Sequence, residues 1–309
     1  MIIEGFFNLE KNPFLIHPNV EFYCQLKPHE EALNMILYAL SNQDGLIKVT
    51  GNIGLGKSIV ASFLREKLLE QEQYHVCEIR NPNLTTVELL ESILRQLSEK
   101  VTDNNISSNS ELLLSNLEHS LIRYRDSKKR MVLIIDEAQA MEDSLLETLR
   151  LLTNLEYDSK PLIQMVLFGQ DELDIKLNQH KFRQLKQRIC FAYKVRPLKS
   201  SEVSTYVQHR LVIAGSNHRQ IFSEPALKLL AKYSNGIPRN INIIAHKAML
   251  FAASANSYQV SNNNVLEALK EHSLYSMLMI DWKKLTIAVL CMANMLIIAA
   301  YFANLSINY

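Results

Sequence analysis

The stretch GNIGLGKS, residues 51–58, decides the fold that this sequence predicts. It follows the order G-x-x-x-x-G-K-[ST] and lies between the apolar run LIKVT (46–50) and a segment with helical periodicity. Glycines let backbone N–H groups turn inward around phosphate oxygens, and the next helix presents its positive dipole end to the same anion. The sequence therefore predicts a phosphate-binding loop between a strand and a helix.

Two side chains of this loop have predicted roles in holding a nucleotide. Lys57 reaches the β- and γ-phosphates as a point charge, and Ser58 offers its hydroxyl to Mg²⁺. We expect nucleotide contacts from the whole loop and the first helical turn: Gly51, Asn52, Ile53, Gly54, Leu55, Gly56, Lys57, Ser58 and Ile59. A chance glycine turn is the alternative, and the strand–loop–helix context disfavours it.

A second motif, MVLIIDEAQ (131–139), ends an apolar strand in two acids. In this setting Asp136 holds Mg²⁺ directly or through water, and Glu137 polarises the attacking water. Taken alone, the pair is explained better as an acidic cap on the next helix. Because the phosphate-binding loop precedes it by about 80 residues, the catalytic interpretation is favoured. ATP and Mg²⁺ are the predicted ligands.

Apolar runs that alternate with helical periodicity extend this prediction along the chain. The predicted strands are residues 46–50, 75–80, 131–135, 162–168 and 190–195. Helices are predicted at 29–42, after Lys57, at 85–98, 111–125 and 144–155. Strands alternating with helices indicate an α/β fold with a mostly parallel sheet covered on both faces. After Pro197 only helices are predicted, at 201–214, 224–234, 239–253 and 262–272.

These patterns divide the chain into an N-terminal strap and helix (1–42), an α/β domain (43–198) and a helical lid (199–273). The first 28 residues are rich in aromatics and prolines, which favours an ordered strap because disordered leaders rarely carry so many aromatic residues. The sequence does not decide whether the strap contacts the adenine base or an adjacent subunit.

Composition excludes several classes of protein. Lys plus Arg is 33 and Asp plus Glu is 32, so a formal charge of +1 does not suggest a whole-molecule nucleic-acid binder, although a local basic patch remains compatible with it. The four scattered cysteines are typical of reduced thiols rather than disulfides or a zinc site: Cys24, Cys77, Cys190 and Cys291. The first residues lack the basic and apolar regions of a signal peptide.

The last segment, DWKKLTIAVLCMANMLIIAAYFANLSINY (281–309), predicts a membrane anchor. Residues 285–303 contain no charged side chain, and at ~1.5 Å per residue this run spans about 28 Å, close to the hydrocarbon thickness of a bilayer. Lys283 and Lys284 precede it, which favours a cytoplasmic body and an extracytoplasmic tail at 304–309. A helix packed on the lid or between subunits is the alternative.

The order of these motifs resembles the AAA+ ATPases, in which a Walker A loop, a Walker B strand and a helical lid follow one another. The resemblance implies that Gln170, at the end of VLFGQ (166–170), is the sensor 1 residue and orients the water or the γ-phosphate. An amide that caps the helix of DELDIKL (171–177) is the alternative.

Arginines complete the site that this resemblance implies. Arg183 or Arg188 is the candidate arginine finger, which acts in trans on a neighbouring subunit's nucleotide, so a homo-oligomeric ring is expected. Arg239, in SNGIPRNIN, is the candidate sensor 2 residue that reaches the γ-phosphate from the lid. Arg150 and Asn154 share one helix face and either contact Glu137 or a neighbouring subunit, or lie on a solvated face.

A narrower resemblance, to the ExeA/GspA-type ATPases of type II secretion, covers about residues 5 to 270. FFNLEKNPF, HEEAL (29–33), LRLLTNLE (149–156), FGQDEL (168–173) and RQLKQRI carry it. The likeness is greatest to the shorter MshM-type ATPase of mannose-sensitive haemagglutinin (MSHA) pilus biogenesis. Longer members continue into a periplasmic peptidoglycan-binding domain, which is not expected here because the sequence stops six residues after the apolar run.

The sequence thus predicts a single-pass inner-membrane AAA+ ATPase that supports assembly of a type II secretion or type IV pilus-like (MSHA) apparatus, with inner-membrane assembly proteins as partners. TniB- and MuB-type transposition ATPases share the core, so a DNA-binding regulatory ATPase is the alternative. The near-neutral charge makes nucleic acid a less expected partner without excluding it. A nucleotide-gated scaffold with slow turnover is a third hypothesis.

Overall fold

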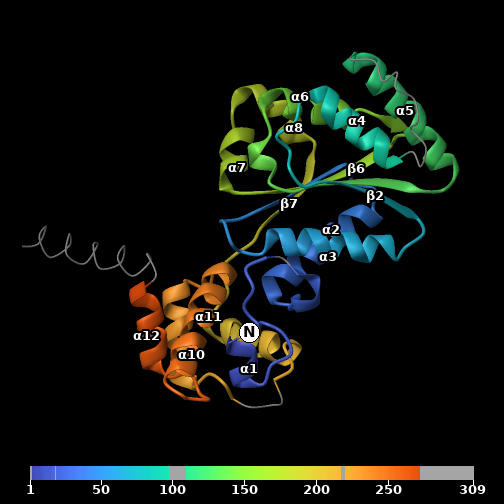
Figure 1. Ribbon diagram of the computed structural model, residues 1–309. Helices are drawn as coiled ribbons and strands as arrows, with labels where there is room; N and C mark the ends of the chain where they lie inside the picture. Colours follow the sequence, from blue (N-terminus) through green and yellow to red (C-terminus); the bar gives the residue numbers. More distant parts are fainter. Residues whose placement is uncertain (1, 18, 98–108, 217–219, 272–309) are drawn as a thin grey trace, which may run out of the picture.

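A five-stranded parallel sheet lies at the centre of the α/β part of the computed structural model, which describes residues 2–17, 19–97, 109–216 and 220–271 (Figure 1). The strands are β1 (Leu46–Thr50), β2 (Tyr74–Ile79), β3 (Arg130–Ile135), β6 (Ile163–Gly169) and β7 (Ile189–Lys194). They lie in the order β2-β3-β6-β1-β7, and every neighbouring pair is parallel. The predicted α/β fold is therefore confirmed.

Both faces of the sheet are buried, because successive side chains on a strand point to opposite faces. On β3, Leu133 enters one core while Val132 and Ile134 enter another. The Leu133 side is covered by α4 (Thr86–Leu97), α5 (Ser110–Asp126), α6 (Asp143–Leu152), α7 (Asp171–Leu177) and α8 (Arg183–Gln187). The opposite side is covered by α2 (Lys27–Ser41) and α3 (Lys57–Leu69), as Figure 1 shows.

A separate bundle of helices follows the last strand, as predicted. It consists of α9 (Ser200–Ile213), α10 (Glu224–Ser234), α11 (Pro238–Ser254) and α12 (Asn262–Glu271). Pro238 at the first turn of α11 fits a position where the backbone donor is not needed. We refer to this bundle as the lid.

Most of the buried residues of the N-terminal strap pack into the lid, and Tyr23 enters the core on one face of the sheet. The strap begins with α1 (Ile2–Phe7), which contacts α11, and it includes the short 3₁₀ helix η1 (Val20–Phe22). Phe7, Phe14 and Phe22 are buried in the same core as the lid helices. The ring of Phe14 meets that of Phe222 edge-on, with 5.9 Å between the centroids. The two ends of the described chain thus share one hydrophobic core.

Several short elements carried too little periodicity to be predicted. The helix predicted at 144–155 ends at Leu152, and a hairpin of β4 (Glu156–Tyr157) and β5 (Lys160–Pro161) follows it. Asp158 and Ser159 at its tip both have positive φ, as a tight two-residue hairpin turn requires. The 3₁₀ helices η2 (Ala138–Ala140) and η3 (His180–Phe182) are equally short.

The predicted membrane span at 285–303 and the tail at 304–309 lie outside the described residues. Within the part of the chain that the structure describes, no helix combines the length and apolar character needed to cross a bilayer.

We expect the strap to contribute directly to the stability of the lid. Phe14 is 2% exposed, so Phe14→Ala should lower the free energy of unfolding of the lid by about 3–5 kcal/mol through lost burial and the cavity left behind. Leu15→Ala is the matched control, because Leu15 is 44% exposed and its truncation should change stability by less than about 0.5 kcal/mol. Urea unfolding of both variants measures the difference, and equal midpoints would contradict the role of the strap.

Candidate nucleotide site

The loop between β1 and α3 adopts a backbone that only glycine tolerates well at two positions. Gly54 and Gly56 have φ angles of 82° and 89°, in the left-handed region. Space is restricted as well: a Cβ added at Gly54 would lie 2.8 Å from the Arg239 Cβ, and one at Gly56 would lie 3.0 Å from the His29 Nε2. The loop is therefore closely surrounded by the lid on one side and α2 on the other.

Lys57 closes this loop from inside. Its Nζ donates hydrogen bonds to the backbone oxygens of Gly51 (2.7 Å) and Asn52 (3.0 Å). The side chain is buried, and this burial lowers the pKa of the ammonium group, while the Glu137 and Asp136 carboxylates act in the opposite direction. The two carboxylates favour the charged form of the buried ammonium group, and it is this cation that attracts phosphate oxygens.

Ser58 and Asp136, the two predicted Mg²⁺ ligands, lie close enough for the Ser58 hydroxyl to affect the pKa of the Asp136 carboxyl. Burial raises the pKa of the Asp136 carboxyl, and the Ser58 hydroxyl and the Glu137 backbone N–H lower it in part. The described residues contain no cluster of three or more His, Cys, Asp or Glu side chains that could hold a metal. One hydroxyl and one carboxylate suit Mg²⁺, which keeps several waters and takes phosphate oxygens as its remaining ligands.

Glu137 lies in a ring of hydrogen bonds with two glutamines. The Gln170 Nε2 donates to the Glu137 Oε2 (3.1 Å), and the Gln139 Nε2 donates to the same oxygen. The Gln170 backbone N–H in turn donates to the Gln139 Oε1 (2.9 Å). Gln170 is the N-cap residue of α7, but its side chain does not cap that helix. The alternative interpretation of Gln170 as a helix cap is therefore wrong.

Gln139 was not singled out from the sequence, although it lies inside the quoted motif. The available signal was a polar residue two positions after the acid pair, just beyond the carboxyl end of β3. It connects Glu137, two residues after that strand, with Gln170, the residue after β6, so it fixes the spacing between the two predicted catalytic groups.

The lid reaches the site through the first turn of α11. The Arg239 backbone N–H donates to the Gly54 oxygen (3.2 Å). The Arg239 side chain lines a cavity of about 480 Å³ together with Lys57, Glu137 and Gln170. Four residues predicted from separate motifs thus meet at one hollow.

The predicted loop residues contribute unequally to this cavity. Its lining includes Ile53, Gly54, Gly56, Lys57, Ser58 and Ile59. Gly51 and Asn52 serve as the acceptors for Lys57, and Leu55 is only 2% exposed because its side chain packs into the core under the loop.

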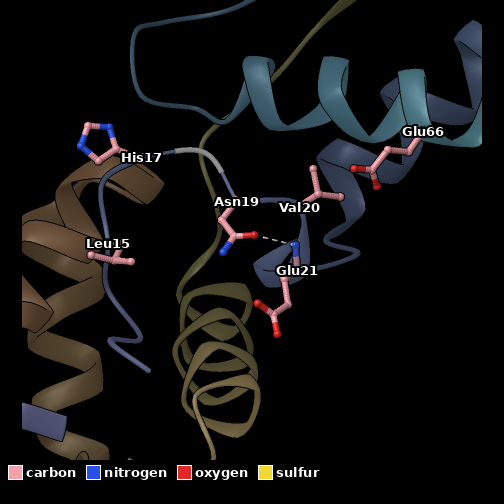
Figure 2. Close-up of a pocket in the computed structure, with 6 residues that line it drawn as sticks. All are labelled: Leu15, His17, Asn19, Val20, Glu21 and Glu66. Carbon is pink, nitrogen blue, oxygen red and sulfur yellow. Dashed lines mark hydrogen bonds between the residues drawn. The ribbon is translucent and has the colours of Figure 1, made fainter. Parts of the chain in front are cut away.

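The strap contributes part of the cavity wall. Leu15, His17 and Asn19 line this cavity and also a second hollow, whose lining residues Figure 2 shows. Asn19 fixes its course, because its Oδ1 accepts a hydrogen bond from the Glu21 backbone N–H (3.0 Å) at the start of η1.

His29 supports the loop from α2; it begins the HEEAL stretch (29–33), but the sequence predicts no role for it. Its Nε2 lies 2.8 Å from the Leu55 backbone oxygen, and the ring stacks near Tyr23. Burial lowers the pKa of this imidazole. A neutral ring that donates to the carbonyl of the loop holds the loop at a fixed distance from α2.

Arg210, on α9, ties the strap to the lid. Its guanidinium is buried and donates to the backbone oxygens of Pro13 and Leu15 and to the Tyr206 hydroxyl, and it lies 4.8 Å from the Phe22 ring centroid. These bonds satisfy a buried cation without a carboxylate. The strap backbone is therefore fixed at the rim of the cavity.

The remaining predicted arginines lie elsewhere. Arg188 contacts Asn154 (2.8 Å) and Glu156 (3.7 Å), and Arg183 is exposed at the start of α8. Neither lines the cavity within the described part of this chain. Arg150 pairs with Glu147 (2.6 Å), so it does not contact Glu137 here.

Comparison with known proteins agrees with this geometry. A family model described as an AAA domain matches residues 40–177. General secretion pathway protein A of Aeromonas hydrophila is 37% identical over 268 residues, which cover 87% of this chain and 48% of that protein. The chain is a P-loop NTPase of the AAA type, related to general secretion pathway protein A. It spans about half the length of that curated relative.

Solved structures share the fold of this AAA protein. Cdc6p from Pyrobaculum aerophilum is similar with a TM-score of 0.64 at 17% identity, covering 87% of this chain and 70% of that one. The ORC2 protein of Aeropyrum pernix has a TM-score of 0.58 at 18% identity, covering 79% and 66%. The RuvB branch migration motor of Thermotoga maritima has a TM-score of 0.53 at 17% identity, covering 81% and 70%.

We expect His29 to make stability depend on pH. Its pKa in the folded protein is lowered, so below about pH 6.5 the unfolded chain binds more protons than the folded one, and stability falls as the pH decreases. In His29→Gln, whose amide can still donate to Leu55, the loss of unfolding free energy between pH 7.5 and 5.5 should be smaller. His209 and His246 titrate in both proteins and cancel in the comparison. Identical pH slopes in urea unfolding would contradict this.

Proposed function

We propose that this AAA protein binds and hydrolyses ATP with Mg²⁺ in the cavity between the phosphate-binding loop and the lid. The observation that carries the proposal is the meeting of Lys57, Ser58, Glu137, Gln170 and Arg239 at this one cavity. These groups come from β1–α3, β3, β6 and α11, and they provide the cations, metal ligands and carboxylate that phosphoryl transfer to water needs.

Each group has a distinct part in the proposed reaction. Lys57 and the loop N–H groups hold the phosphates, and Ser58 with Asp136 would hold Mg²⁺, which neutralises charge on the phosphate oxygens when bound. Glu137 accepts the proton of the attacking water. Gln170 and Gln139 orient that carboxylate through one of its oxygens, which leaves the other oxygen for water.

Two variants separate binding from chemistry. Lys57→Ala should abolish tight ATP binding and reduce hydrolysis at least about 100-fold, because it removes the buried cation. Glu137→Gln should keep ATP binding and reduce turnover about 100-fold or more, because it removes the base. Phosphate release and binding of a fluorescent ATP analogue provide the two measurements. Wild-type turnover in Lys57→Ala would exclude this site as the catalytic one.

We propose that the active form is a homo-oligomer, because Arg183 and Arg188 lie outside the cavity of their own chain. One of them neutralises transition-state charge on a neighbour's nucleotide. Of the two variants Arg183→Ala and Arg188→Ala, the one that removes the finger should reduce turnover as strongly as Glu137→Gln, while ATP binding is retained. If neither arginine variant loses turnover, the trans-acting finger is contradicted.

We further propose that this ATPase supports assembly of a secretion or type IV pilus-like apparatus of the MSHA kind at the inner membrane. The name of the relative, general secretion pathway protein A, supports a secretion role, and the motif LRLLTNLE with FGQDEL resembles that family. Residues 285–303 would anchor the protein in the membrane, with the ATPase on the cytoplasmic side.

The anchor can be tested with the full chain. We expect the full chain to stay with the membrane fraction after carbonate washing and to be released by mild detergent. A variant that ends at residue 280 should appear in the soluble fraction with its ATPase activity intact. Recovery of both proteins in the soluble fraction would mean that the apolar run packs against protein and is not an anchor.

A further inference from the structure

A hollow whose charged side chains are all basic lies at the amino ends of the strands, opposite to the nucleotide site. Its volume is about 210 Å³, and its inner wall includes Met131 at the start of β3 and Gln164 at the start of β6. The nucleotide site follows the other ends of the same strands. A six-residue strand is about 20 Å long, so the two sites are separate.

Five cationic side chains surround this basic hollow. They are Arg125, Lys128, Lys129, Arg130 and Lys160. No carboxylate lines it, and none of the five forms an ion pair with a described residue, in contrast to Arg196, which is paired with Glu202. The run RYRDSKKR (123–130) holds five cations and one acid in a protein whose formal charge is +1. The basic hollow is therefore a local concentration of positive charge.

The floor of the basic hollow is fixed by backbone contacts. Gln164 is 3% exposed, and its Nε2 donates to the backbone oxygens of Leu40 and Asp44, both at 3.1 Å. Since Gln164 belongs to a central strand of the sheet, the surrounding cations are held over a rigid base.

The basic surface continues beyond this hollow. A neighbouring hollow of about 400 Å³ shares Lys129 and adds Arg123 with the hydroxyl-bearing Ser120 and Ser127. On the other side, the exposed ring of Tyr157 lies 5.8 Å from the Arg125 guanidinium carbon. Cations, hydroxyl groups and an exposed aromatic ring therefore follow one another along the end of α5 and the hairpin.

We propose that this basic surface binds the sugar–phosphate backbone of a nucleic acid. Ammonium, guanidinium and hydroxyl groups donate hydrogen bonds, and phosphodiester oxygens are a repeating series of charged acceptors. The Tyr157 ring, already beside a guanidinium, offers a face on which a base can stack. The contacts read the backbone, so binding is independent of sequence. This site goes beyond the proposed ATPase function and does not depend on it.

Two other polyanions fit the surface less well. An acidic peptide carries its charges on side chains of varied spacing, whereas the phosphodiester groups of a nucleic acid repeat at regular intervals along the backbone that the cations face. A lipid surface is broad and flat, whereas these cations line a concavity. The surface also lies at the end of α5, far from α12, after which the proposed anchor segment follows in the sequence (Figure 1).

The test measures binding of a labelled 20-nucleotide single strand and of its duplex to the full chain in mild detergent, by fluorescence anisotropy. The expected result is micromolar binding to at least one of them that weakens as salt rises. Lys128→Ala/Lys129→Ala/Lys160→Ala should weaken binding at 100 mM salt at least about tenfold, and the slope of log K against log salt should become shallower by about one for each lysine removed.

The matched control removes lysines outside the basic surface. Lys67→Ala/Lys228→Ala/Lys270→Ala changes three cations that line neither hollow and should bind the oligonucleotide as the wild type does. Circular dichroism establishes that all variants are folded. Absence of salt-sensitive binding, or equal loss in both variants, overturns the proposal. Competition by poly-glutamate or by anionic phosphatidylglycerol vesicles as strong as that by the unlabelled oligonucleotide also overturns it, in favour of an acidic protein or a membrane.

Discussion

The site depends on how closely the phosphate-binding loop approaches the first turn of the lid helix α11. The Arg239 N–H donates to the Gly54 oxygen, and no Cβ fits between the two residues. Because Gly54 has a left-handed backbone as well, a substitution there would both strain the loop and push the lid away. The cavity exists only while this contact holds two separate hydrophobic cores against one another.

The strap adds a second connection between the same two parts. Arg210 fixes the strap backbone to α9, and further along the strap Tyr23 stacks with Phe63 of α3, with ring centroids 4.1 Å apart. His29 then carries the connection to the carbonyl of Leu55 in the loop. Two sets of contacts therefore connect the lid with the nucleotide loop, one through Gly54 and one through α2.

Much of this arrangement could be predicted from the sequence because its signals are local. Lys57, Ser58 and the acid pair at 136–137 each follow a strand at a fixed spacing. The carboxyl ends of parallel strands lie along the same side of the sheet, so these residues are brought together. His29 and Arg210 had no such signal, because each acts on a backbone oxygen that is 26 or more residues away in sequence. Gln139 does carry a local signal, because it is a polar side chain close to the acid pair. The finger arginine cannot be assigned from the sequence of one chain, because its expected partner is the nucleotide of a second chain.

The strap is synthesised well before the lid helices that it packs against. Arg210 bonds to Pro13 across 197 positions, and the core around Phe14 needs residues up to α12. During translation the aromatic strap stays without its native core until the lid emerges, which at ~5–20 residues per second takes about 10 to 50 seconds. Closing a loop of this length is also entropically costly, so the lid is expected to assemble late. The nascent chain therefore exposes the apolar aromatic surface of the strap until the lid is synthesised. Chaperone binding to the strap would protect the chain from aggregation during this time.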